Sequence, residues 1–244
     1  LNKLKKTDFV IHCASHTNAQ GSFSIKKEMF RNNIACMKNI INYCKLKKSK
    51  LIHISSTSVY GKQVKIVNED DENLLKPQSP YAEIKLIEER LLKKNKNKIN
   101  YMTFRFGTIA GVSKGMRFHT AINKFCLNAS FNEKIQIYKT AYNQYRPYLS
   151  LHDAFKIFQF CINRNIFNND IYNALSGNFT VSQIIKMIKK YKKRIGVKFV
   201  KTKIMNQLSY HVENKKLNRL GLNLNYSIEK DIKDTLHLFK NLNY

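Results

Sequence analysis

The sequence predicts an α/β fold built around a parallel sheet. Short apolar runs typical of buried strands, such as residues 51–54, are followed by segments in which apolar residues recur every three or four positions. One strand is expected at residues 7–14, and the next segment predicts an amphipathic helix with Phe30, Ile34, Met37, Ile41 and Cys44 on one face. Hydroxyl residues gather where the strand at 51–55 ends, which is the edge at which α/β proteins bind ligands.

Composition sets the broad class of the protein. The chain has 244 residues, of which 43% are hydrophobic, enough for one large or two small globular domains. No apolar run is long enough to span a bilayer, and the N-terminus has no signal-peptide core, so we expect a cytoplasmic protein without a membrane partner. Five widely spaced cysteines fit a reducing compartment, and the histidines lack metal-ligand spacing, so no metal site is expected.

The formal net charge of +28 is the most unusual feature of the composition. Such an excess suggests a basic protein associated with nucleic acid, which is one alternative hypothesis. The lysines, however, are scattered along the chain, and the local runs at 45–48 and 189–194 lie at or near predicted helix ends, where cations are favourable. We therefore expect no nucleic acid as a partner.

Two motifs predict proton-transfer chemistry. Residues 55–61 read Ser-Ser-Thr-Ser-Val-Tyr-Gly after a predicted strand, and residues 80–85 read Pro-Tyr-Ala-Glu-Ile-Lys at the start of a predicted helix. Tyr81 and Lys85 are four residues apart and share a helix face. A lysine ammonium beside a phenol favours the phenolate, and Ser56 would hold a substrate oxygen, so the trio suits alcohol–ketone interconversion.

These motifs resemble those of the extended short-chain dehydrogenase/reductase family, of the NAD-dependent sugar epimerase/dehydratase type. The resemblance extends from Thr7 onward and implies a Rossmann-like doubly wound parallel sheet with a smaller C-terminal substrate domain. It places a partial NAD(P)-binding domain at 1–112. It assigns 113–244 mostly to substrate binding, with strands returning to the sheet near 148–153 and 171–174.

The family's glycine-rich Gly-x-x-Gly-x-x-Gly turn has no counterpart in this sequence. The strand at 7–14 matches the family's fourth strand, so the first strands of the sheet are expected to be lacking and its edge to be bare. We expect the sequence to be an N-terminally truncated fragment of a longer enzyme.

The resemblance also assigns roles to single residues. It implies the cofactor NAD or NADP and a nucleotide-sugar substrate. The catalytic residues would be Ser56, Tyr81 and Lys85; the cofactor-binding residues Ala14, Asn33, Ser55, Tyr81, Lys85 and Phe106; and the substrate-binding residues Ser56, Thr108, Arg117 and Arg146. His12 is expected to be a structural strand residue, and the acidic run at 69–72 a solvated loop.

The implied reaction is epimerisation of a nucleotide sugar through a transient keto-sugar. A 4,6-dehydratase of the family carries Thr-Asp-Glu at the strand end, whereas Ser56-Thr57-Ser58 stand here without a carboxylate. A keto-sugar or ketone reductase needs the same trio and is an alternative, as is a truncated, non-catalytic nucleotide-sugar-binding relative. Relatives commonly dimerise through the helices near Asn33 and Tyr81, so the resemblance also allows a homodimer.

Overall fold

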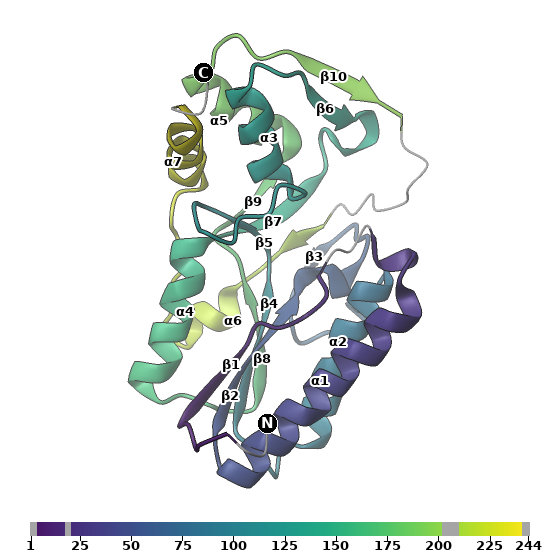
Figure 1. Cartoon of the computed structure of the whole chain (residues 1–244), viewed down its shortest axis with the longest axis vertical. Coiled ribbons are helices and arrows are strands. Elements are labelled where there is room, and N and C mark those ends of the chain that lie inside the picture. The colour runs from purple at the N-terminus through teal and green to yellow at the C-terminus, as the bar shows by residue number, and fades with distance from the viewer. Residues whose placement is uncertain (1–3, 18–20, 202–209, 241–244) are drawn as a thin grey trace.

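The centre of the molecule is a four-stranded parallel sheet in the order β1-β2-β4-β8 (Figure 1). The computed structural model describes residues 4–17, 21–201 and 210–240. The sheet strands are β1 (Phe9–His12), β2 (Lys50–Ser56), β4 (Tyr101–Phe106) and β8 (Asp170–Ala174). All three pairings are parallel, so the carboxyl ends of the strands meet at one edge of the sheet.

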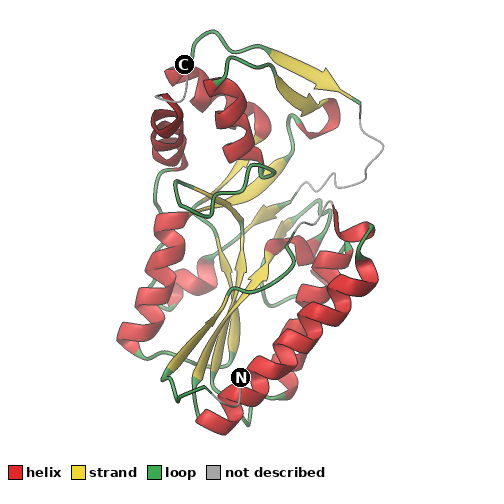
Figure 2. Ribbon diagram, in the orientation of Figure 1, coloured by secondary structure: helices red, strands yellow, loops and turns green. Residues whose placement is uncertain are grey.

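Helices cover both faces of this sheet (Figure 2). On one face lie α1 (Lys26–Lys47) and α2 (Pro80–Lys94), and on the other lie α4 (Leu151–Arg164) and α6 (Lys215–Arg219). Apolar side chains of β2 and β4 pack against α4 and α6, while Leu51 and Tyr101 pack with Met37 and Ile41 of α1. The predicted α/β, doubly wound class is confirmed.

A smaller layered region extends beyond the carboxyl ends of the strands, and a separate core of buried residues holds it together (Figure 1). It contains the antiparallel pair formed by β7 and β9, the parallel pairs β5·β7 and β6·β10, and three helices. Its elements are β5 (Thr108–Ala110), α3 (Ala121–Ser130), β6 (Ile135–Tyr138), β7 (Tyr145–Ser150), β9 (Gly177–Thr180), α5 (Val181–Tyr191), β10 (Val197–Val200) and α7 (Ile228–Lys240).

One predicted strand placement is wrong. The segment near 148–153 does not return to the main sheet, because its strand, β7, pairs with β5 and β9 in a separate three-stranded sheet. The edge of β4 opposite β2 is already occupied by β8, in a register that aligns Met102 with Asp170. Residues 151–164 form α4 instead of strand.

The outer edge of β1 has no strand partner among the described residues. Another small parallel pair, β3 (Ile66–Val67) with β11 (His211–Val212), links the loop after β2 to the C-terminal part of the chain. Within the described residues, no helix is both long enough and apolar enough to cross a membrane.

Candidate active site

The hydroxyls at the end of β2 form a tight turn. Ser56 is the N-cap of the short 3-10 helix η2 (Thr57–Tyr60), and its Oγ accepts hydrogen bonds from the Ser58 backbone N–H at 3.2 Å and from Ser58 Oγ at 2.9 Å. Thr57 Oγ1 donates to the Phe106 carbonyl at the end of β4, at 3.2 Å. Ser56 is half-buried, and the hydrogen bonds from Ser58 hold its hydroxyl in place at the end of β2.

Gly61 ends this turn and is required by the backbone. Its φ is +65°, and a Cβ built at this position would lie 1.9 Å from the carbonyl oxygen of Lys76. A side chain at position 61 would therefore collide with the loop that leads into α2. The glycine of the Ser-Ser-Thr-Ser-Val-Tyr-Gly motif sets the path of the chain between the strand-end hydroxyls and the helix that carries Tyr81.

A capping serine and a proline begin helix α2. The Ser79 side chain accepts a hydrogen bond from the Ala82 backbone N–H at 3.2 Å, and Pro80 occupies the first turn, where its missing N–H costs nothing. Tyr81 lies half-buried in that turn, and the Lys85 Nζ lies 6.0 Å from the centroid of the Tyr81 ring. The structure thus brings the predicted phenol and ammonium together.

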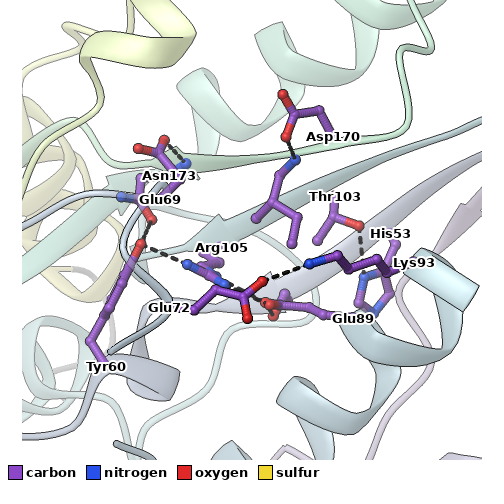
Figure 3. Close-up of polar contacts among 12 residues, drawn as sticks. His53, Tyr60, Glu69, Glu72, Glu89, Lys93, Thr103, Arg105, Asp170 and Asn173 are labelled. Atoms are coloured by element: carbon purple, nitrogen blue, oxygen red, sulfur yellow. Dashed lines mark hydrogen bonds and ion pairs between the residues drawn. The ribbon is translucent and has the colours of Figure 1, made fainter. Parts of the chain in front are cut away.

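Beneath the strand ends lies a buried polar network that sequence reasoning missed (Figure 3). Arg105 on β4 donates from Nε and Nη2 to the two carboxylate oxygens of Glu89 on α2, at 3.0 and 2.7 Å. Its Nη1 donates to the Tyr60 hydroxyl at 2.8 Å, and the Tyr60 hydroxyl donates to Asn173 Oδ1 on β8, also at 2.8 Å. The network ties β4, β8, α2 and the Val-Tyr-Gly turn into one rigid unit.

Burial decides the protonation state of Tyr60. Burial raises the pKa of Tyr60 to about 12, although the adjacent Arg105 opposes the shift. Tyr60 is therefore a neutral hydrogen-bonding group at physiological pH.

The five predicted cofactor positions other than Tyr81 occupy different settings. Ala14 is exposed just beyond the end of β1, and Lys85 lies close to Tyr81. The Asn33 side chain holds the loop after β1, because it accepts from the His16 backbone N–H at 3.0 Å and donates to Ser15 Oγ at 3.0 Å. Ser55 donates to Glu89 at 2.5 Å, and the Phe106 ring is part of the core, so these side chains have structural partners.

The predicted substrate positions lie in the smaller region and on its connections. Thr108 begins β5, and Arg117 is exposed on the loop before α3, where its Nη1 contacts Thr17 of the loop after β1. Burial raises the pKa of Tyr210, a residue that sequence reasoning missed, and the charge of Arg146 on β7 opposes this shift. Tyr210 is buried, and its hydroxyl oxygen lies 3.3 Å from Thr57 Oγ1.

Two further expectations are resolved by the structure. His12 is a buried residue of β1, and burial, followed by the neighbouring His53, lowers the pKa of His12 to about 4. The acidic run at 69–72 is not wholly solvated, because half-buried Glu69 accepts from the Asn173 backbone N–H at 2.6 Å. No cluster of metal-binding side chains occurs within the described residues.

Comparison with known proteins places this site in a family context. The sequence model of the NAD dependent epimerase/dehydratase family matches residues 1–174. The ADP-L-glycero-D-manno-heptose-6-epimerase of Brachyspira hyodysenteriae is 28% identical over 181 residues, which cover 71% of this chain and 56% of that protein. The dTDP-D-glucose 4,6-dehydratase of Dictyostelium discoideum is 28% identical over 193 residues, covering 74% of this chain and 43% of that enzyme.

Solved structures share the fold. The UDP-N-acetylglucosamine 4-epimerase of Methanobrevibacter ruminantium, in complex with UDP-N-acetylmuramic acid, superposes with a TM-score of 0.86 at 21% identity, covering 97% of this chain and 77% of that one. The UDP-glucose 4-epimerase of Thermus thermophilus, in complex with NAD, gives a TM-score of 0.82 at 18% identity, covering 96% and 78%. The chain spans about a third to just over half of the length of the curated relatives it matches.

Proposed function

Because the chain belongs to the NAD dependent epimerase/dehydratase family, we propose that it forms the catalytic part of a nucleotide-sugar epimerase. The observation that carries the proposal is the pairing of Tyr81 and Lys85 on the first turns of α2, with the Lys85 Nζ 6.0 Å from the Tyr81 ring. The hydroxyl of Ser56 stands at the end of β2, the strand that packs against this helix.

Each of the three residues has a distinct task. Tyr81 takes the proton from a sugar hydroxyl and later returns it, so it acts as general base and then as general acid. The Lys85 ammonium stabilises the phenolate form of Tyr81 by its charge. Ser56 donates its hydroxyl to the oxygen that becomes a carbonyl, while hydrogen bonds from Ser58 keep Ser56 in position. The epimer would form once the keto-sugar has turned over, regained a hydride at its carbonyl carbon, which a bound nicotinamide would supply, and regained the proton on its oxygen from Tyr81.

The residues present fit a nicotinamide cofactor in part. Of the described residues, Glu88 is the one that accepts a hydrogen bond from Lys85, and an ammonium carries three donors, so Lys85 has donors left for a ribose diol. The small Ala14 leaves the backbone after β1 open to a ligand. When bound, NAD or NADP supplies the hydride acceptor and donor. The hydroxyl of Ser55 and the amide of Asn33 are committed to protein partners and would support this site indirectly.

The substrate would lie between the strand ends and the smaller region. Arg146 and Arg117 are the cations on the predicted substrate side, and a guanidinium binds two phosphate oxygens at once, as a nucleotide diphosphate requires. The Arg117 contact with Thr17 places this arginine beside the loop that follows β1. Positions 57 and 58 carry hydroxyls rather than carboxylates, which favours epimerisation over dehydration at this strand end.

The proposal is tested with the full-length protein, NAD and a panel of UDP-hexoses, with the anomeric protons of the sugars followed by NMR. We expect interconversion of two epimers, and Tyr81→Phe should slow it by roughly 10²- to 10⁴-fold because the acid–base group is lost. Tyr191→Phe, at an exposed tyrosine of α5, is the matched control and should leave the rate unchanged. Equal rates in the wild type and Tyr81→Phe would exclude this mechanism, and net consumption of NADPH with a keto-sugar would favour the reductase alternative.

Two further parts of the proposal concern the setting of the enzyme. We infer a cytoplasmic protein, supported by five cysteines that are all free thiols. We also infer a homodimer through α1 and α2, by resemblance to relatives. Sedimentation of the purified protein tests the dimer, since a mass of one chain at micromolar concentration would refute it.

A further inference from the structure

A buried ion pair lies next to Tyr81. Lys85 is 3% exposed, and its Nζ donates to Glu88 Oε2 at 2.8 Å, one turn along α2. Glu88 is fully buried. A lysine in such a place is strongly disfavoured in its charged form unless an opposite charge lies in contact with it. The residue that allows Lys85 to stay charged therefore affects the proposed proton transfer as well as the stability of the fold.

The oxygen of Glu88 that binds Lys85 also contacts a histidine of the sheet. His53 on β2 has its Nε2 3.1 Å from Glu88 Oε2. Its Nδ1 lies 3.3 Å from Thr103 Oγ1 on β4, a contact drawn in Figure 3. An ionised carboxylate only accepts hydrogen bonds, so His53 Nε2 carries the hydrogen in this contact. Glu88 Oε2 is thus fixed between two donors, one of them Lys85.

The other titratable groups that face this pair do not replace Glu88. His12 on β1 stacks on His53 with 6.1 Å between the ring centroids, and it is neutral at physiological pH. Cys13 lies just after β1, and Cys36 faces the pair from α1. Burial raises the pKa of Cys13 and of Cys36, so both are thiols. On α2 itself, Glu89 acts on Lys85 only at a distance, because both of its oxygens bind Arg105.

We propose that Glu88 is a positioning residue for the proton transfer at Tyr81: it keeps the Lys85 ammonium charged and anchors it beside the Tyr81 ring. The catalytic consequence rests on the proposed function, whereas the ion pair itself does not. Burial lowers the pKa of Lys85, but the oxygens of Tyr81 and then of Glu88 outweigh burial and hold this pKa above its usual value. Without Glu88, the largest fixed negative charge in contact with Lys85 is gone.

The test uses the full-length protein with lysine labelled at Cε, and NMR follows the titration of Lys85, assigned with Lys85→Met. Glu88→Gln keeps the shape of the side chain and removes its charge. We expect the pKa of Lys85 to fall by more than about one unit, and the alkaline limb of the pH–rate profile to move to lower pH with it. Glu83→Gln is the matched control on the same helix. Glu83 pairs with Lys26 at the surface, at 3.5 Å, so this variant should shift neither quantity.

Each outcome decides one claim. A Lys85 titration that stays within about 0.3 unit of the wild type in folded Glu88→Gln overturns the proposal, as does a shifted titration with an unmoved alkaline limb. If Glu88→Gln does not fold, Glu88→Asp is used instead, because it retracts the carboxylate by one methylene. It should lower the Lys85 pKa by a smaller, measurable amount. An unshifted Lys85 pKa in Glu88→Asp also overturns the proposal. Suppose that Glu88→Gln shifts the Lys85 titration but the wild-type protein has no epimerase activity. That result refutes the proposed function and leaves the charge-holding role of Glu88 supported.

Discussion

Replacing Glu89 by glutamine should destabilise this protein far more than the same change at Glu72. Glu89 and Arg105 are both almost fully buried, and their ion pair is bidentate at 2.7 and 3.0 Å. Glu89→Gln leaves the Arg105 guanidinium, whose pKa lies well above its usual value, without a counter-charge. Breaking a buried pair in this way costs about 3 to 5 kcal/mol, a large share of the roughly 5 to 15 kcal/mol that stabilise an ordinary domain.

Glu72 offers a control within the same view of the structure (Figure 3). It pairs with Lys93 at 2.6 Å, but the side chains of Glu72 and Lys93 are 75% and 66% exposed. Water screens such a pair, so Glu72→Gln should cost less than about 1 kcal/mol. The short distance alone would rank the two pairs as equal, and burial is what separates them.

The assay is equilibrium unfolding in urea, with the free energy of unfolding extrapolated to water. A loss of less than about 1 kcal/mol in Glu89→Gln would refute the reasoning. A second check is the double variant Glu89→Leu/Arg105→Leu, which removes both charges. It should be more stable than Glu89→Leu alone, because no uncompensated guanidinium stays buried. A double variant less stable than the single one would show that the pair stabilises the fold by more than mutual neutralisation.

Two further predictions concern pH. The pKa of His12 in the folded protein is about 4, below its usual 6.5, so its contribution to stability is complete above pH 6.5 and is lost as the pH falls toward 4. His12→Leu should remove up to about 3 kcal/mol of this loss of stability in acid. The measurement is the urea midpoint of unfolding between pH 7 and 4. Burial raises the pKa of Asp231 from 3.8 to about 6, so the wild type loses stability as the pH rises through this window. Asp231→Asn should match it near pH 4 and exceed it by about 1 to 2 kcal/mol at pH 7, and equal pH profiles would contradict the burial argument.

Local sequence patterns predicted the strand that carries Ser56 and the helix that carries Tyr81 and Lys85. The apolar run before Ser56 is β2, close to the expected bounds of 51–55. Ser79 and Pro80 begin α2 just before Tyr81, because a capping hydroxyl and an N-terminal proline act within a few residues of each other. Such short-range signals survive folding whatever the rest of the chain does.

The partners of that trio could not be predicted in the same way. On α2, Ile87 and Leu91 are only half-buried, whereas Glu88 and Glu89 are buried. A pattern of apolar and polar residues counts a carboxylate as exposed, since it cannot register the cation that makes burial tolerable. Glu88 pairs with Lys85 on the same helix, and Glu89 pairs with Arg105, which lies sixteen residues after it in the chain.

The pairing of strands far apart in the sequence could not be predicted either. The segment that became β7 has the composition of a strand, but composition does not say which sheet a strand joins. Its partners β5 and β9 are fixed by the register of Thr108 with Tyr148 and of Tyr148 with Gly177. Tyr210, which contacts Thr57 from the far end of the chain, carried no signal at all in the sequence.

The most direct test of the central claim, that Tyr81 moves a proton during sugar oxidation, is rapid mixing of the NAD-loaded full-length protein with a UDP-hexose that it epimerises. The account predicts a transient rise in reduced nicotinamide absorbance in the wild type, and a rise slower by at least about 10²-fold in Tyr81→Phe. Transients of equal rate in the two proteins would contradict it, because the proton would then leave the sugar without Tyr81.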